Sequence, residues 1–269
     1  MTSFVAALLG VIQGLTEFLP VSSSAHLILA RAFFGWDAQA FGLAFDVACH
    51  LGTLIAVLVF FRRDIAAMLA AVPAMFSARP TPPARLAWLI VIGTVPAVVV
   101  GLLFGDLIED RLRTPAVAAV TLSVVALAFF AVERFSAHRR GHDSLSVAEA
   151  VLLGIAQAAA LVPGVSRSGG TIVAAMAVGL RREEAARFTF LLGIPAILGA
   201  AVLEGRVLLK TGLSSADAQL FLVGMVTSAL VGYFTVKYFI RYLAGHSLAA
   251  FAWYRLLLAA SVAVWLLAL

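Results

Sequence analysis

The chain has 269 residues, of which 63% are hydrophobic and only 12% are charged, and its mean hydropathy is +1.06. Soluble domains carry about 25% charged residues, so this composition excludes a soluble fold and predicts an all-α integral membrane protein whose helices satisfy their own backbone hydrogen bonds. The net charge of +5 comes from basic residues between apolar runs, which indicates membrane topology rather than nucleic-acid binding, and a single cysteine, Cys49, excludes an intrachain disulfide.

The first apolar region, residues 4–34, is broken midway by Pro20 and a serine cluster. Each half is about 13 to 16 residues, or roughly 20 to 24 Å of helix, which is too short for a hydrocarbon core of about 30 Å. This pattern predicts a re-entrant helix pair. Three apolar stretches of spanning length follow it, at residues 45–61, 86–104 and 116–132.

The second half of the chain repeats this plan. Residues 147–180 are broken at Pro163, and three spans are predicted at 188–203, 219–236 and 253–269, which gives about six transmembrane helices plus two re-entrant pairs. Gln13 and Ser22 are nine residues apart, as are Gln157 and Ser166. We therefore expect a single membrane domain, residues 1–269, built from repeat one (1–135) and repeat two (147–269). Each repeat crosses the membrane an odd number of times, so the two form an inverted repeat.

Basic residues set the predicted orientation. Thirteen of the nineteen, Arg255 among them, fall on one face, five fall on the other, and Arg167 lies within the second break. The richer face is cytoplasmic by the positive-inside rule. This topology predicts that both termini are outside, in the periplasm, and that the two re-entrant segments enter from opposite sides and meet near the midplane.

The first break carries an acid and an amide on one helix face. Glu17 follows Gln13 by four residues, one helical turn, so both side chains project the same way. A carboxylate in an apolar segment costs about 2.5 to 3.5 kcal/mol and usually faces a cavity, a partner or an ion. The alternative is a carboxylate that reaches a membrane edge.

A hydroxyl cluster and a histidine follow the same break. Ser22, Ser23 and Ser24 come directly after Pro20, at the predicted N-terminus of a half-helix whose free N–H groups favour an anion, and His26 lies one turn further. Packing serines and a histidine bonded to a backbone carbonyl are the plainer alternatives. We favour phosphate binding for Ser22 and Ser24 and a catalytic role for Ser23 and His26.

The second break has the composition of a phosphate cradle. Glycines allow close backbone approach, hydroxyls donate to phosphate oxygens, and a guanidinium matches phosphate in a bidentate way. The alternative, a close-packed patch of small residues, does not explain an arginine in lipid. The predicted phosphate ligands are Ser166, Arg167, Ser168, Gly169, Gly170 and Thr171.

Other polar residues have plainer interpretations. Asp46 and His50 share a helix face near the outer membrane edge, and Gln157 mirrors Gln13, so interfacial anchoring or helix-to-helix hydrogen bonding is expected of each. The remaining histidines occupy charged loops and are expected to be solvated; they are His138, His142 and His246.

Residues 13–26 and 163–171 resemble the two signature segments of the bacterial undecaprenyl-diphosphate phosphatase family, also called the bacitracin-resistance family, and the likeness covers essentially the whole chain. The first position of the family's paired-acid motif can be Glu or Gln, and here it is Gln13, so Glu17 carries the acidic role. The resemblance implies a bacterial inner-membrane enzyme that hydrolyses undecaprenyl diphosphate, recycles the lipid carrier for peptidoglycan synthesis and confers bacitracin resistance. It also implies a divalent cation, Mg²⁺ or Ca²⁺.

In the mechanism we expect, the second break holds the phosphate while Glu17, with Gln13 as a second ligand, positions the metal or a proton. Three routes stay open: Ser23 attacks with His26 as base, His26 forms a phosphohistidine, or His26 activates water. On topology alone the rival function is an alternating-access transporter or flippase for a phosphorylated lipid or anion. A homodimer is compatible with the sequence, which leaves the oligomeric state open.

Overall fold

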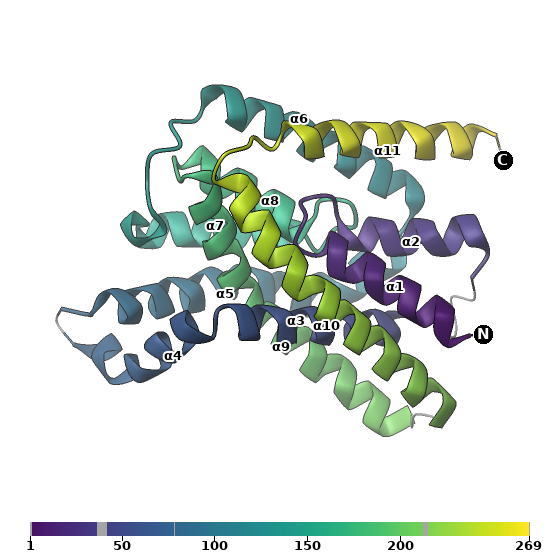
Figure 1. The fold of residues 1–269 in the computed structure, drawn as a ribbon, viewed down its shortest axis with the longest axis horizontal. Helices are drawn as coiled ribbons and strands as arrows, with labels where there is room; N and C mark the ends of the chain where they lie inside the picture. The colour runs from purple at the N-terminus through teal and green to yellow at the C-terminus, as the bar shows by residue number, and fades with distance from the viewer. Residues whose placement is uncertain (1, 37–41, 78, 212–214, 269) are drawn as a thin grey trace.

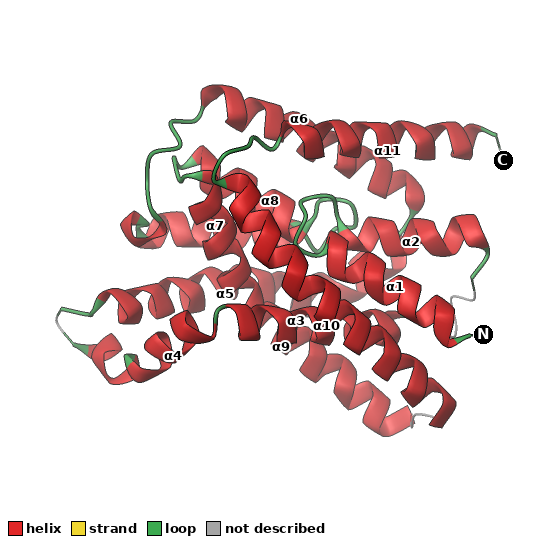
Figure 2. Cartoon of the chain, in the orientation of Figure 1, coloured by secondary structure: helices red, strands yellow, loops and turns green. Residues whose placement is uncertain are grey.

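The computed structural model describes residues 2–36, 42–77, 79–211 and 215–268, and within these ranges the chain is helical and has no strand. Figures 1 and 2 show the helices packed as one bundle. The helices are α1 (Ser3–Thr16), α2 (Ser23–Phe34), α3 (Leu43–Phe60), α4 (Arg62–Ala70), α5 (Pro82–Leu107), α6 (Pro115–Phe135), α7 (Val147–Ala159), α8 (Arg167–Ala177), α9 (Arg182–Thr211), α10 (Ser215–Leu243) and α11 (Ala249–Leu267).

Five helices among the described residues are long and apolar enough to cross a membrane, namely α5, α6, α9, α10 and α11. A sixth crossing forms if α3 counts together with α4, from which it is bent by 75°. The predicted class, an all-α membrane protein with about six spans, is thereby confirmed. The bend after Phe60 was not predicted. It falls where the apolar span meets the first polar residues of α4, Arg62 and Arg63.

Both predicted breaks interrupt the chain where the sequence places them. In the first, α1 ends at Thr16, Pro20 lies in the turn, and α2 begins after Ser22. In the second, α7 ends at Ala159 and α8 begins after Ser166. The two serines share an unusual backbone, with φ of 74° and 73°, and each N-caps its short helix. Equivalent serines with the same rare conformation support the predicted duplication.

The two repeats interleave in space. The span α10 of repeat two packs against α1 and α3, whereas α5 of repeat one packs against α7 and α9. A Cβ on Gly10 would lie 2.6 Å from the Gly224 carbonyl oxygen, and a Cβ on Gly154 would collide with the carbonyl of Gly93. These two glycine contacts are equivalent under the duplication. The absence of side chains lets the helix backbones touch, as is common in membranes.

The breaks lie in the middle of the bundle, with α6 and α11 packed together on one side of them (Figures 1 and 2). The first turn of α1, the end of α2 and the end of α11 lie at the right of Figure 1, whereas α4 lies at the far left. Both chain ends therefore lie at one end of the bundle. The inverted relation of the repeats and the side of the membrane that each end faces stay predictions.

One residue was misplaced in the charge count. Arg255 was assigned to the cytoplasmic face, but its side chain is fully buried within the bundle. The sequence prediction began the last span at Trp253, so Arg255 was read as an edge residue, while α11 begins at Ala249 and carries it inside. Without Arg255 the count is twelve basic residues against five, and the bias keeps its sign.

Candidate active site

The buried carboxylate of Glu17 is the centre of the polar cluster between the breaks. It lies directly after α1, is only 5% exposed, and accepts hydrogen bonds at Oε2 from Gln13 Nε2 at 2.8 Å and from Ser23 Oγ at 2.7 Å. The guanidinium of Arg167 pairs with Oε1, and His50 Nε2 lies 3.4 Å from Oε2. Three elements therefore direct donors at one carboxylate, and His50 of a fourth element lies beside it, which offsets the cost of burying its charge.

Arg167 connects the second break to the first. It is the first residue of α8, and besides Glu17 it donates to the carbonyl of Gly193 on α9 at 3.3 Å. A Cβ at Gly193 would lie 3.2 Å from the guanidinium carbon, so a glycine there lets the arginine lie flat against α9. This intramembrane arginine is therefore paired with Glu17, the acid of the first break, and its predicted role as a phosphate ligand stays a prediction.

The serine hydroxyls build the two half-helix N-termini. Ser22 Oγ accepts from the Ala25 N–H at 3.4 Å, and Ser166 Oγ accepts from the Gly169 N–H at 3.0 Å. Ser168 Oγ donates to the carbonyl of Leu19 at 3.2 Å, so α8 touches the first break directly. Both N-termini thus converge on the Glu17 cluster, and unused N–H groups at helix starts favour an anion there.

His26 makes its hydrogen bonds to groups other than Ser23. Its Nδ1 lies 2.7 Å from the carbonyl oxygen of Ser22, and its Nε2 lies 2.7 Å from the hydroxyl of Tyr254 on α11, whose ring stacks on the imidazole. Both ring nitrogens are therefore engaged, and the hydrogen-bond partner of the Ser23 hydroxyl is Glu17. Of the three routes left open by the sequence, the one with His26 as the base for Ser23 has no direct hydrogen bond behind it among the described residues, and the roles of both residues stay predictions.

The rest of the predicted cradle surrounds the start of α8. Thr171 is fully buried, and its hydroxyl has no hydrogen-bond partner among the described residues. A Cβ at Gly169 or Gly170 would lie within 3.2 Å of Ser166 or Val165 side-chain atoms, so these glycines let the loop pack on its own helix. Ser24 bonds Ser22 at 3.2 Å between hydroxyl oxygens. Of the cradle, only Arg167 reaches Glu17 directly.

Two neighbours of the site were not predicted for it. For His50 we predicted an interfacial anchor or a helix-to-helix hydrogen bond, not a place in the site. Its Nε2 lies 3.4 Å from Glu17 Oε2, and its Nδ1 lies 2.7 Å from the carbonyl oxygen of Asp46. A histidine inside an apolar span was the available signal. No sequence pattern indicated that Tyr254 belongs to the site, because its contact with His26 depends on how α11 packs. Asp46 itself pairs with Arg31 and Arg113 at the end of the bundle.

The other polar predictions have mixed outcomes. Gln157 is buried, but neither amide atom has a hydrogen-bond partner among the described residues, so the expected interhelical bond is absent there. His142 is not simply solvated, because it pairs with Glu184. His138 Nε2 lies 3.0 Å from the Val132 carbonyl oxygen, and His246 is exposed, as expected.

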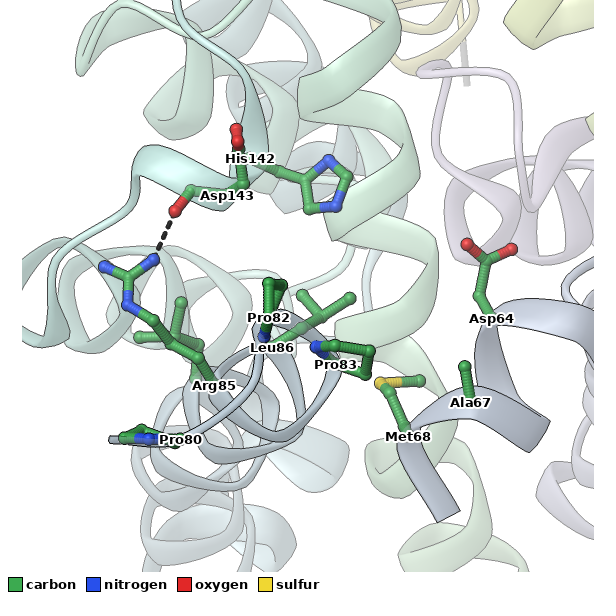
Figure 3. A pocket seen from close by; sticks show the side chains of 11 residues that line it. Asp64, Ala67, Met68, Pro80, Pro82, Pro83, Arg85, Leu86, His142 and Asp143 are labelled. Atoms are coloured by element: carbon green, nitrogen blue, oxygen red, sulfur yellow. Dashed lines mark hydrogen bonds between the residues drawn. The ribbon is translucent and has the colours of Figure 1, made fainter. Parts of the chain in front are cut away.

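A cavity of about 370 Å³ lies elsewhere, between α4, the start of α5 and the turn at His142 (Figure 3). Prolines and Met68 form much of its wall, and Asp64 and His142 stand on opposite sides of it. None of its lining residues belongs to either break. The cavity is therefore separate from the Glu17 cluster.

Two half-helix N-termini that converge with an arginine on a buried acid define a membrane protein that handles phosphate or another oxyanion. A family model described as bacitracin resistance protein BacA matches residues 6–261, and the chain belongs to this family. The chain is 51% identical to an undecaprenyl-diphosphatase of Rubrobacter xylanophilus over 97% of each chain. It is 46% identical to one of Alcanivorax borkumensis, over 99% of this chain and 100% of that one. A third, from Pelotomaculum thermopropionicum, is 42% identical over 98% of this chain and 97% of its own. The resemblance inferred from the two motifs is confirmed.

Proposed function

We propose that this protein hydrolyses undecaprenyl diphosphate to undecaprenyl phosphate and inorganic phosphate, recycling the lipid carrier in the bacterial plasma membrane. The observation that carries the proposal is the pairing of Glu17 with Arg167, which joins two polar breaks 150 residues apart inside apolar helices. The names of the relatives support the same reaction. A carrier that only moves an anion has no need for a hydroxyl held on a buried carboxylate.

The second break binds the terminal phosphate. Arg167 offers a planar fork that suits phosphate oxygens, and the first turn of α8 adds backbone N–H groups. The hydroxyl of Thr171, which has no hydrogen-bond partner among the described residues, is a further donor. A phosphate in the site competes with Glu17 for the guanidinium. Substrate binding therefore loosens the Arg167 pairing and leaves Glu17 with its donors Gln13 and Ser23.

The first break supplies the chemistry. Ser23 Oγ attacks the terminal phosphorus, its proton passes to Glu17, and the bond from phosphorus to the bridging oxygen breaks to release undecaprenyl phosphate. Water then attacks the phosphoserine, the bond from phosphorus to Ser23 Oγ breaks, Glu17 returns its proton to Ser23, and the proton lost by the water leaves with inorganic phosphate. The 2.7 Å contact from Ser23 to Glu17 favours this route over one with His26 as the base. His26, held between Ser22 and Tyr254, orients the start of α2.

The donor set also suits a divalent cation delivered with the substrate. Gln13 Oε1 is buried without a hydrogen-bond partner among the described residues, and it lies beside the carboxylate of Glu17. Magnesium is commonly held by one or two protein oxygens together with substrate phosphates, so these two residues would hold Mg²⁺ or Ca²⁺. When bound, the ion neutralises charge on the diphosphate.

The ion pairs agree with the proposed orientation, in which both termini are periplasmic. Arg31, Arg113 and Asp46 lie together at the end proposed to be outside. Arg187 pairs with Asp64 at the end proposed to be cytoplasmic.

The test measures phosphate release from undecaprenyl diphosphate by the purified protein in detergent, with Mg²⁺, with Ca²⁺ and with a chelator. We expect metal-dependent release that falls by at least about a hundredfold in Glu17→Gln and Arg167→Met, the usual loss when one charge-stabilising group is removed. Ser123→Ala is the matched control, because this serine bonds only its own helix. Folded wild type without release under any metal would favour a transporter.

A further inference from the structure

The buried guanidinium of Arg255 is a feature that the proposed chemistry does not use. It lies in the apolar helix α11 and has no exposed surface. Among the described residues, all five of its hydrogen bonds end on backbone carbonyl oxygens. A charged side chain inside a membrane helix is costly and usually marks a functional place.

Three of the five carbonyls that Arg255 binds belong to the two breaks, and the other two belong to α6. Its Nη1 donates to Pro20 at 3.1 Å, and its Nη2 donates to Gly164 at 2.7 Å and to Val165 at 3.3 Å. Pro20 and Gly164 each lie two residues before a capping serine, so their carbonyls are equivalent under the internal duplication. One guanidinium therefore satisfies the same carbonyl of both repeats, groups that neither break can pair within its own helix.

The position of Arg255 relative to α8 shows what this contact fixes. Its Nη1 would lie 3.4 Å from a Cβ at Gly169, in the first turn of α8, and its Nε donates to the Leu122 carbonyl of α6 at 3.2 Å. Arg255 thus contacts the residues just before both half-helix N-termini and links them to α6. The second break binds phosphate and the first break supplies Ser23, so their relative position sets the distance over which the reaction must occur.

We propose that Arg255 is a positioning residue for phosphoryl transfer, which holds the two breaks in register without touching the substrate. This inference rests on the proposed phosphatase function for its kinetic consequence. Its structural consequence does not depend on that function. Loss of the Arg255 guanidinium should loosen both breaks together, although they are far apart in the chain.

The kinetic test compares Arg255→Lys and Arg255→Met with wild type. An ammonium keeps the charge but cannot span two carbonyls as a planar fork does, so both variants should lose about a hundredfold in kcat, with KM within about threefold. Arg62→Lys is the matched control, because Arg62 donates to one carbonyl, that of Val59, outside the breaks. A kcat within threefold of wild type in Arg255→Met would overturn the proposal, and a raised KM with unchanged kcat would show that Arg255 contacts the substrate.

The second measurement does not depend on activity. Amide hydrogen exchange of wild type and Arg255→Met should show faster exchange at residues 23–26 and 168–170 together, with α5 unchanged. Loosening at only one break, or at neither, would contradict the positioning role. Wild type without phosphatase activity would overturn the proposed function, and the exchange result would still decide the role of Arg255.

Discussion

The pairing of Glu17 with Arg167 can be tested as a free energy of unfolding. Arg167→Met leaves a carboxylate that is 5% exposed without its guanidinium, and removing one partner of a buried ion pair costs about 3 to 5 kcal/mol. Gln13, Ser23 and His50 remain beside the carboxylate. We therefore expect the lower end of that range, about 3 kcal/mol.

The opposite change should cost less. Glu17→Gln leaves an arginine whose side chain is 22% exposed and which keeps the Gly193 carbonyl as an acceptor. We expect a loss of about 1 to 2 kcal/mol, because one charged hydrogen bond disappears while its donor still reaches polar surroundings. The double variant should be close to Glu17→Gln alone, which gives a coupling of about 3 kcal/mol between the two sites, equal to the loss in Arg167→Met.

The assay is reversible unfolding in mixed micelles, followed by far-ultraviolet circular dichroism, for wild type, both single variants and the double variant. Arg62→Met serves as a surface control and should change the free energy by less than about 0.5 kcal/mol. Phosphate release should fall about a thousandfold in Arg167→Met. Losses of stability that simply add in the double variant would refute the assigned pairing, whatever the activities are.

Three further predictions concern the hydroxyls and the glycine contacts. Ser23→Ala should lower kcat by at least about a thousandfold, while Ser24→Ala, whose hydroxyl bonds only Ser22, should lose less than tenfold; near-normal phosphate release from Ser23→Ala would exclude the serine route. Tyr254→Phe should lower kcat by about tenfold, the effect of one lost hydrogen bond to His26, and an unchanged rate would mean that this contact has no catalytic value. Gly154→Val should lower the stability by about 2 to 3 kcal/mol in thermal unfolding, because a side chain there meets the α5 backbone, whereas Gly199→Val has open space; equal effects would contradict the α5–α7 contact.

The fold was largely predictable because lipid imposes a simple rule on the chain. Apolar stretches of spanning length appear in the structure as α3, α5, α6, α9, α10 and α11, and the two interrupted regions appear as pairs of short helices. Helix ends extended beyond the apolar windows, since polar residues continue the helix past the hydrocarbon core. That extension is the reason why Arg255 was counted at an edge.

The site was predictable where its residues are neighbours in the sequence. Glu17, Ser23 and Arg167 stand out because polar residues cluster at apolar breaks, and the structure brings these three together. His50 and Tyr254 reach the site from helices whose sequences look like ordinary spans. Their contribution is a property of helix packing, which hydropathy does not encode.

The interleaved packing has a consequence for how the protein is made. Since α10 covers α1 and α5 covers α7, neither half of the chain can bury its own glycine faces. The anchor at Arg255 lies in α11, so we expect both breaks to lack its support until α11 has been synthesised. Chains that stop before α11 should therefore be inactive. Two separately expressed halves, divided in the loop before α7, should regain function only when they meet in the same membrane.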